Sequence, residues 1–217
     1  MIPTKSALLL GATGLTGSHL LNMLLDSKQY HSVIIYIRKP VNIHHPKLEE
    51  RLIDYDTWQE VVKADDVFCC LGTTIKKAKT REAFKKVDLE YPVKIAQLQY
   101  KAGSKKFLVV SAMGADSHSA IFYSQVKGEM EELLQQIGYG SLFIFRPSFI
   151  TGDRKEKRAG ESIGIGLSKL ISPLLIGPLR KYKSVSAYAI AKAMLHGAQT
   201  ETRGTQILLS DEIKKFE

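Results

Sequence analysis

The chain has 217 residues and a mass of 24.2 kDa, which is the size of a single domain. Hydrophobic residues make up 44% of it and charged residues 24%, and this composition excludes a disordered, collagen-like or coiled-coil protein. The net charge of +9 favours an anionic partner, but charge alone leaves phosphate ligands, nucleic acids and membrane surfaces open.

Short apolar runs alternate with segments of helical periodicity along the chain. Strands are predicted at residues 6–10, 33–37, 51–53, 67–71, 107–110, 142–145 and 206–209, and helices at residues 15–25, 57–63, 81–100, 121–137 and 186–198. This order predicts an α/β fold with a doubly wound, mainly parallel Rossmann sheet. We expect one domain over residues 1–217, in which residues 151–217 partly form a small C-terminal α/β cap on the substrate side.

Cys69 and Cys70 are neighbours in a predicted strand, so their side chains point to opposite faces and no disulfide between them is expected. This pattern favours a reducing compartment. The apolar run at residues 7–10 is too short for a signal peptide, and no apolar stretch reaches the ~18 residues of a transmembrane helix. We therefore expect a cytoplasmic protein without membrane contact.

A glycine-rich turn gives the sharpest local signal. Gly11, Gly14 and Gly17 follow the first predicted strand and open the first predicted helix. In a dinucleotide-binding turn, such glycines permit the tight turn, the approach of the backbone to the pyrophosphate, and close packing of helix on sheet. The positive end of the helix then faces the phosphates. The pattern favours nucleotide binding over a merely structural turn.

The end of the second predicted strand indicates which dinucleotide is bound. An acidic residue there would bind the ribose 2′-hydroxyl and repel a 2′-phosphate, but this strand ends in Arg38 and Lys39. A charge-assisted hydrogen bond to a phosphate contributes ~1.5–3 kcal/mol. NADP(H) is therefore preferred over NAD(H), and a solvated basic pair is the alternative interpretation.

Tyr123 and Lys127 lie four residues apart in a segment of helical periodicity, so their side chains share one helix face. Tyrosine normally ionises near pH 10, and a nearby ammonium lowers its pKa by stabilising the phenolate. Such a pair can donate a proton to a carbonyl oxygen while hydride reaches the carbon. Tyr123 and Lys127 are therefore candidate catalytic residues.

These two motifs together resemble the short-chain dehydrogenase/reductase superfamily. Longer motifs are similar to its atypical subgroup of HIV Tat-interacting-protein-like oxidoreductases. They are Phe68-Cys-Cys-Leu-Gly-Thr-Thr74, Val87-Asp88, Ser111-Ala-Met-Gly-Ala115, Phe122-Tyr-Ser-Gln-Val-Lys-Gly-Glu129 and Arg146-Pro147. The resemblance covers about residues 6–200. It implies an NADP(H)-binding Rossmann fold and leaves the substrate open.

The resemblance also implies cofactor contacts along the chain. They are Gly11, Thr13, Gly14, Leu15, Thr16 and Gly17 in the pyrophosphate turn, Arg38 and Lys39 at the 2′-phosphate, Asp54 and Tyr55 at the adenine, Leu71, Gly72 and Thr73 beneath the ribose, Tyr123 and Lys127 at the nicotinamide ribose, and Pro147, Phe149 and Ile150 behind the nicotinamide ring.

One position departs from the family pattern. The superfamily usually places a serine or threonine after the fifth strand to polarise the substrate carbonyl, and Ser111 ends this strand here. Related members often have a second serine where this chain has Ala112, and in longer relatives the catalytic hydroxyl falls nearer Met113. Ser111 is the third candidate catalytic residue, with a strand-end or cofactor contact as its alternative role.

Other features add little chemistry. His44 and His45 lack the spacing and companions of a metal site, so no metal is expected. No nucleic-acid-binding module is recognisable, so direct nucleic-acid binding is not expected either. The stretch at residues 163–179 is interpreted as a cover over the substrate pocket, with a homodimer face or a membrane contact as alternatives.

The sequence thus predicts an NADPH-dependent oxidoreductase that reduces a small carbonyl or an activated alkene. A small substrate is expected because little of the chain follows Ile150. The alternative is a non-catalytic, NADP(H)-binding regulatory or redox-sensing protein that acts through a protein partner.

Overall fold

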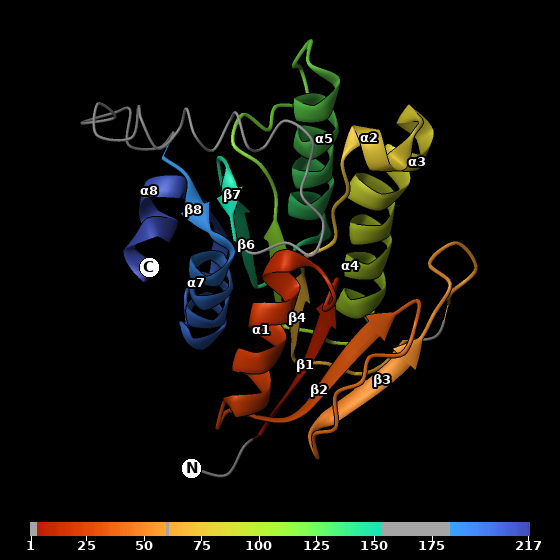
Figure 1. The fold of residues 1–217 in the computed structure, drawn as a ribbon, viewed down its shortest axis with the longest axis vertical. Helices are drawn as coiled ribbons and strands as arrows, with labels where there is room; N and C mark the ends of the chain where they lie inside the picture. Colours follow the sequence, from red (N-terminus) through yellow and green to blue (C-terminus); the bar gives the residue numbers. More distant parts are fainter. Residues whose placement is uncertain (1–3, 60, 153–182) are drawn as a thin grey trace.

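The computed structural model describes residues 4–59, 61–152 and 183–217. Within them, the main sheet has seven parallel strands in the order β3-β2-β1-β4-β5-β6-β9 (Figure 1). They are β1 (Lys5–Leu10), β2 (Tyr30–Ile37), β3 (Leu48–Leu52), β4 (Asp66–Cys69), β5 (Lys106–Val110), β6 (Ser141–Arg146) and β9 (Gly204–Leu209). The predicted α/β Rossmann fold is confirmed.

Helices cover both faces of the sheet. Helices α1 (Leu15–Asp26) and α7 (Ala187–Gln199) pack on one face, and α4 (Tyr91–Lys101) and α5 (Phe122–Ile137) pack on the other (Figure 1). Successive strand residues therefore enter different cores: Leu9 lies in the α1/α7 core, and its neighbour Leu8 lies in the α4/α5 core. Burial on both faces explains why the strands are continuously apolar.

The strand order places a ligand crevice at the centre of the sheet. The chain moves outward from β1 to β2 and β3, and then returns to β4 on the other side of β1. The connections after β1 and β4 consequently leave in opposite directions. Open α/β sheets bind ligands at this switch point, outside the carboxyl ends of the strands.

One predicted helix, at residues 57–63, is wrong. In the described part of this segment a single turn forms, closed by the bond from the Trp58 N–H to the Asp54 carbonyl (2.8 Å). The Trp58 ring then packs on Tyr36 (4.7 Å between centroids), and the Val62 N–H donates to the Tyr36 hydroxyl (3.4 Å). These contacts with the core override the helical pattern of the segment.

The helix predicted at residues 81–100 consists of three pieces. It begins as α3 (Arg81–Lys85), widens into a π-helical turn (Lys86–Glu90) and continues as α4. Pro92 explains the widening, because a proline has no N–H to bond to residue 88 and its ring collides with that carbonyl in a regular α-helix. The short helix α2 (Ile75–Ala78), which precedes α3, was not predicted.

The described C-terminal residues complete the main domain. Strand β9 is the seventh strand of the sheet, and α7 covers one of its faces. Strands β7 (Ile150–Thr151) and β8 (Val185–Ser186) form a separate parallel pair, and α8 (Ser210–Ile213) with a 3-10 turn (Lys214–Phe216) ends the chain. The stretch at residues 163–179, interpreted above as a pocket cover, lies outside the described residues.

The loop between β5 and α5 packs directly on Gly128. A Cβ atom there would lie 2.1 Å from the Ser117 nitrogen and 2.2 Å from the Asp116 carbonyl carbon. Alanine is the better helix former by about 1 kcal/mol, but this overlap with backbone atoms outweighs that preference. We expect Gly128→Ala to lower the free energy of unfolding by about 1–3 kcal/mol in chemical denaturation.

Gly140→Ala is the matched control for that variant. Its Cβ atom would have its nearest neighbour, the Lys105 carbonyl oxygen, at 3.8 Å, which is an ordinary contact. The change should therefore stay within about 0.5 kcal/mol. Equal stabilities of the two variants would contradict the close packing of the loop on α5.

Candidate functional site

The glycine turn joins the carboxyl end of β1 to α1. Gly11 has φ +76°, and a Cβ atom on it would lie 2.6 Å from the Cys70 carbonyl oxygen. A Cβ atom on Gly17 would lie 2.0 Å from the Gly11 carbonyl oxygen. Only glycine fits either position, so the turn and the first turn of α1 are held against each other and against the end of β4.

The amino end of α1 is open to an anion. Gly14 caps this helix without a side-chain hydrogen bond, so no side chain of the cap residue occupies the first N–H groups. Thr13 and Gly14 are exposed, whereas Thr16 and Gly17 are buried against the sheet. A cradle of bare backbone at the positive end of a helix fits the pyrophosphate of a dinucleotide.

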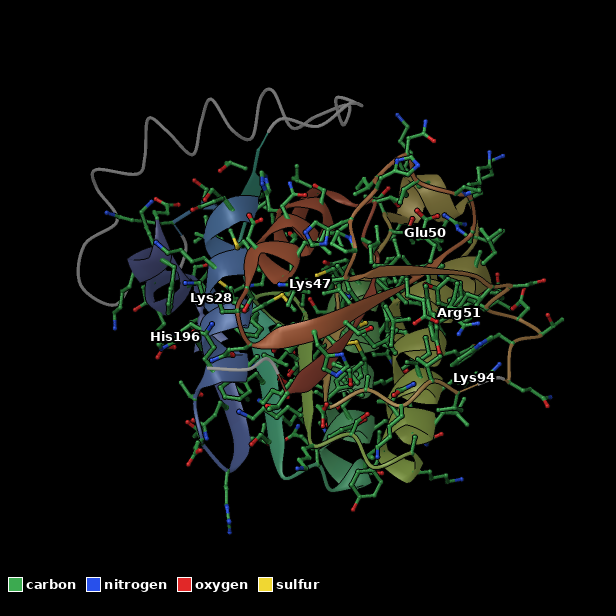
Figure 2. All side chains as sticks on the ribbon, turned by 90° about the horizontal axis from the view of Figure 1, so that it is seen from below. Lys28, Lys47, Glu50, Arg51, Lys94 and His196 are labelled. Carbon is green, nitrogen blue, oxygen red and sulfur yellow. The ribbon has the colours of Figure 1, made fainter. Side chains whose placement is uncertain are left out.

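The ends of β2 and β3 lie next to the turn. Arg38 and Lys39 follow β2 and are exposed, and Asp54 is exposed after β3. Tyr55 is buried: its hydroxyl donates to the Tyr36 carbonyl (3.2 Å), and burial raises its pKa, an effect that Arg38 partly opposes. Lys94, labelled in Figure 2, holds the same loop by donating to the Tyr55 carbonyl (3.3 Å).

Helix α5 carries Tyr123 and Lys127 on one face, where Tyr123 is half-buried and Lys127 is buried. The Lys127 ammonium forms an ion pair with Asp88 of the π-helical turn (2.8 Å), and both side chains are nearly inaccessible, at 4% and 1%. Burial by itself lowers the pKa of Lys127, but the Asp88 carboxylate and Tyr123 raise it, and the net direction is upward. Lys127 is thus held as a charged ammonium inside the protein.

Asp88 also reaches the loop after β4. The Asp88 Oδ2 atom accepts the Thr73 N–H (2.8 Å). Gly72 lies beside the same carboxylate: a Cβ atom added to it would lie 3.5 Å from Asp88 Oδ1. Leu71, Gly72 and Thr73 are the residues predicted to lie beneath the ribose. Asp88 therefore connects this loop to Lys127.

One aromatic ring, that of Phe84, packs against Tyr123. Phe84 of α3 lies 5.6 Å from the Tyr123 ring and 5.7 Å from the Phe122 ring, measured between centroids. The Arg81 guanidinium stacks over Phe122 at 4.9 Å. These contacts pack α3 against the amino end of α5 and hold the Tyr123 ring in position.

Ser111, at the carboxyl end of β5, belongs to a second polar cluster. Its hydroxyl donates to Glu131 of α5, and Glu131 accepts two bonds from the Nε atom of Arg146 (3.0 Å each) and a further bond from its terminal nitrogen. Glu131 is 1% exposed. The cluster ties the ends of β5 and β6 to α5, and the catalytic role of Ser111 stays a prediction.

The residues after β6 lie along the same sheet edge. Pro147 is buried, and its carbonyl accepts the Met113 N–H (2.9 Å). Phe149 is 59% exposed, and its carbonyl accepts the Val185 N–H, while Ile150 is half-buried in β7. The structure thus brings the predicted cofactor and catalytic residues to the carboxyl edge of one sheet.

Sequence reasoning gave no role to Asp88, Glu131 and Arg146. Each lies in a motif or helix that the sequence singled out, but pairing depends on contacts between distant elements. One signal was available for Glu131: Tyr123, Lys127 and Glu131 follow one another at intervals of four residues and so share one helix face.

Two absences hold for residues 4–59, 61–152 and 183–217. No three His, Cys, Asp or Glu side chains in them come together as a metal site. No helix in the same ranges is long and apolar enough to cross a membrane.

Comparison with solved structures supports the fold. MoeE5 in complex with UDP-glucose and NAD superposes with a TM-score of 0.70 at 18% identity, covering 94% of this chain and 75% of that one. A UDP-N-acetylglucosamine 4-epimerase from Methanobrevibacter ruminantium gives 0.71 at 16% identity, over 95% and 77%. At such identities the likeness concerns the fold.

Sequence relatives are closer. Protein HTATIP2 of Rattus norvegicus is 32% identical over 96% of this chain and 87% of its own length. The mitochondrial protein FMP52 of Candida albicans is 32% identical over 73% of each chain, and that of Aspergillus niger 29% identical over 90% and 88%.

The names of the fungal relatives contradict the predicted cytoplasmic location, because those proteins are named as mitochondrial. That prediction was wrong. It rested on cysteines typical of a reducing compartment and on an apolar run at residues 7–10 that is too short for a signal peptide, and neither feature distinguishes the cytoplasm from the inside of a mitochondrion.

A family model described as NAD(P)H-binding matches residues 11–162, which include the glycine turn, Asp88, Tyr123, Lys127 and Ser111. Together with the HTATIP2 relative, this match confirms the resemblance that the motifs indicated. The chain belongs to the NAD(P)H-binding family of Rossmann proteins, as an atypical member of the short-chain dehydrogenase/reductases.

Proposed function

We propose that this protein is an NADPH-dependent reductase of a small carbonyl compound or an activated alkene. The observation that carries the proposal is the buried Lys127–Asp88 ion pair beside Tyr123, at the sheet edge that holds the glycine turn. A charged lysine is costly to bury, so an ion pair that keeps Lys127 charged next to Tyr123 points to a use for that charge in the site.

The cofactor has a matching set of residues. The bare backbone of the glycine turn fits the pyrophosphate, and the exposed Arg38 and Lys39 offer cations for the 2′-phosphate. Pro147, Phe149 and Ile150 supply the apolar surface for the nicotinamide. When bound, the cofactor supplies the hydride that reduces the substrate.

The chain itself handles the proton. Tyr123 donates its phenolic proton to the substrate oxygen, and the Lys127 ammonium stabilises the phenolate that remains. Asp88 keeps Lys127 protonated in spite of its burial, and through the Thr73 N–H it fixes the loop beneath the ribose. In this role Asp88 is a positioning residue.

Removing the phenolic hydroxyl tests the acid. Tyr123→Phe should lower kcat by about 10²–10⁴-fold, the usual contribution of a positioned acid, while the dissociation constant of NADPH stays within about three-fold. Tyr100→Phe is the control, because Tyr100 is a half-exposed tyrosine of α4 that packs on Tyr139. Equal turnover of Tyr123→Phe and the native protein would remove Tyr123 from the mechanism.

Cofactor preference is tested by thermal stabilisation. A ligand at 100 times its dissociation constant adds ~2.7 kcal/mol, so NADPH should raise the melting temperature more than NADH at equal concentration. Arg38→Ala should weaken NADPH binding roughly ten- to a hundred-fold with little effect on NADH. The control is Lys28→Ala, an exposed lysine just beyond the opposite end of α1 (Figure 2). Equal losses for both cofactors would contradict the 2′-phosphate contact.

Asp88→Asn tests the charge on Lys127. The Lys127 pKa is raised in the native protein, so the ammonium is present at neutral pH and is lost only as pH rises through that raised value. Without the carboxylate, burial lowers the pKa unopposed. The alkaline limb of kcat against pH should therefore move to lower pH, whereas Asp88→Glu should restore it in part. An unchanged limb would show that Asp88 does not set this charge.

Turnover itself separates the reductase from a non-catalytic NADP(H)-binding protein. Tight NADPH binding without oxidation of the cofactor on a panel of aldehydes, ketones, quinones and activated alkenes would contradict the proposed reaction.

A further inference from the structure

Ser111 has one hydroxyl proton, and that proton is already used. It is donated to the Glu131 carboxylate in a bond between two buried side chains, which are 4% and 1% exposed. A carboxylate is a stronger hydrogen-bond acceptor than a neutral carbonyl oxygen. The Ser111 hydroxyl therefore keeps its hydrogen bond to Glu131 when a substrate carbonyl is nearby.

Arg146 holds the Glu131 carboxylate in place, so Glu131 and the Ser111 hydroxyl cannot move together toward the substrate. Its carboxylate accepts N–H groups from both the Nε atom and a terminal nitrogen of Arg146, a two-pronged arrangement that fixes its plane. Arg146 ends β6 and Ser111 follows β5. Their hydrogen bonds to Glu131 therefore connect the ends of both strands to α5. We regard Ser111 as part of this anchor.

The next two residues of the loop have no hydroxyl to replace it, because they are Ala112 and Met113. The main chain there is also engaged, since the Met113 N–H donates to the Pro147 carbonyl (2.9 Å). Farther along the loop, the Ser117 hydroxyl is bonded to Glu132.

Met113 is half-buried in the extended segment that follows β5. The bonds from the Ser111 N–H to the Phe145 carbonyl and from the Met113 N–H to the Pro147 carbonyl continue the register of β5 and β6. Residues two apart in such a register share a face, so we expect Met113 on the same side as Ser111 and about 6–7 Å beyond it. On α5, Lys127 lies about 6 Å nearer the amino end than Glu131.

We infer that no hydroxyl at the end of β5 reaches the substrate, that among the described residues Tyr123 is its hydroxyl donor, and that its substrates are electron-poor carbonyl compounds. The inference rests on the proposed reductase and specifies its substrate class. In the reaction, the carbonyl carbon gains hydride from the reduced nicotinamide ring, which is oxidised. The carbonyl π pair moves to the oxygen, and the oxygen takes the proton of Tyr123.

The number of hydrogen-bond donors at the carbonyl oxygen determines how electron-poor a substrate must be to react. Negative charge develops on the carbonyl oxygen in the transition state, and removing one donor from such a site slows acyl-transfer enzymes by about 10²–10³-fold. An electron-withdrawing group on the substrate takes up part of that charge. A site with one hydroxyl donor therefore discriminates steeply in favour of such substrates.

The first test uses para-substituted benzaldehydes, from methoxy to nitro, with the full chain and NADPH. In the native protein kcat/KM should rise at least 100-fold along the series. Met113→Ser adds a hydroxyl after β5 and should raise kcat/KM for the methoxy compound at least ten-fold, with little change for the nitro compound. Met113→Ala provides the same room without a donor and should raise neither.

The second test does not depend on turnover. The carbonyl of ¹³C-labelled 4-nitrobenzaldehyde is followed by infrared difference spectroscopy in the complex with NADP⁺, where no hydride is available. Tyr123→Phe should shift the carbonyl band to higher frequency, because the donor is lost. Met113→Ser should shift it to lower frequency, and Ser111→Ala should leave it in place.

The outcomes are distinct. Turnover with a flat substituent series, a Met113→Ser variant no better than Met113→Ala, or a carbonyl band that moves in Ser111→Ala would each overturn the single-donor inference and leave the reductase standing. Bound NADPH without reduction of any aldehyde in the series would overturn the inference, and the reductase would fall with it only if ketones, quinones and activated alkenes were not reduced either.

Discussion

The ion pair between Lys127 and Asp88 is the interaction on which the rest of the site depends. Both groups lose their hydration on burial, and that cost is offset only while each has the other and its remaining hydrogen-bond partners. The pair therefore fixes three elements at once: α5, the π-helical turn and the loop after β4 that carries Thr73. Removing either charge would leave the other buried and uncompensated.

A second buried carboxylate, Glu131, does comparable work one helical turn farther along α5. Its bonds to Ser111 and Arg146 reach across to β5 and β6. Helix α5 thus carries two buried charges of opposite sign: Lys127 pairs with the π-helical turn, and Glu131 bonds to the ends of β5 and β6. Beside them, the apolar Val126 and Met130 pack in the core. The charged side chains Lys127 and Glu131 fix the position of the helix through specific partners. The apolar side chains Val126 and Met130 contribute buried apolar surface.

Sequence pattern predicted the strands, the glycine turn and the Tyr123–Lys127 pair because each depends on neighbours within a few residues. The helix expected at residues 57–63 failed because Trp58 and Val62 obtain better contacts with Tyr36 in the core. Asp88 as the partner of Lys127, and Glu131 as the partner of Ser111, could not be predicted for a related reason. Each pairing joins residues from different elements, and local periodicity carries no information about which acid meets which base.

The π-helical turn before Pro92 has a consequence for how this region is compared among relatives. One extra residue in a helical turn rotates everything beyond it by about 100° relative to an uninterrupted helix. A helical wheel drawn through residues 81–101 as one unit therefore mixes two faces and blurs the apolar stripe of each half. The two halves have to be aligned separately, and a one-residue deletion in this turn would carry Asp88 away from α5 without altering the composition of either helix.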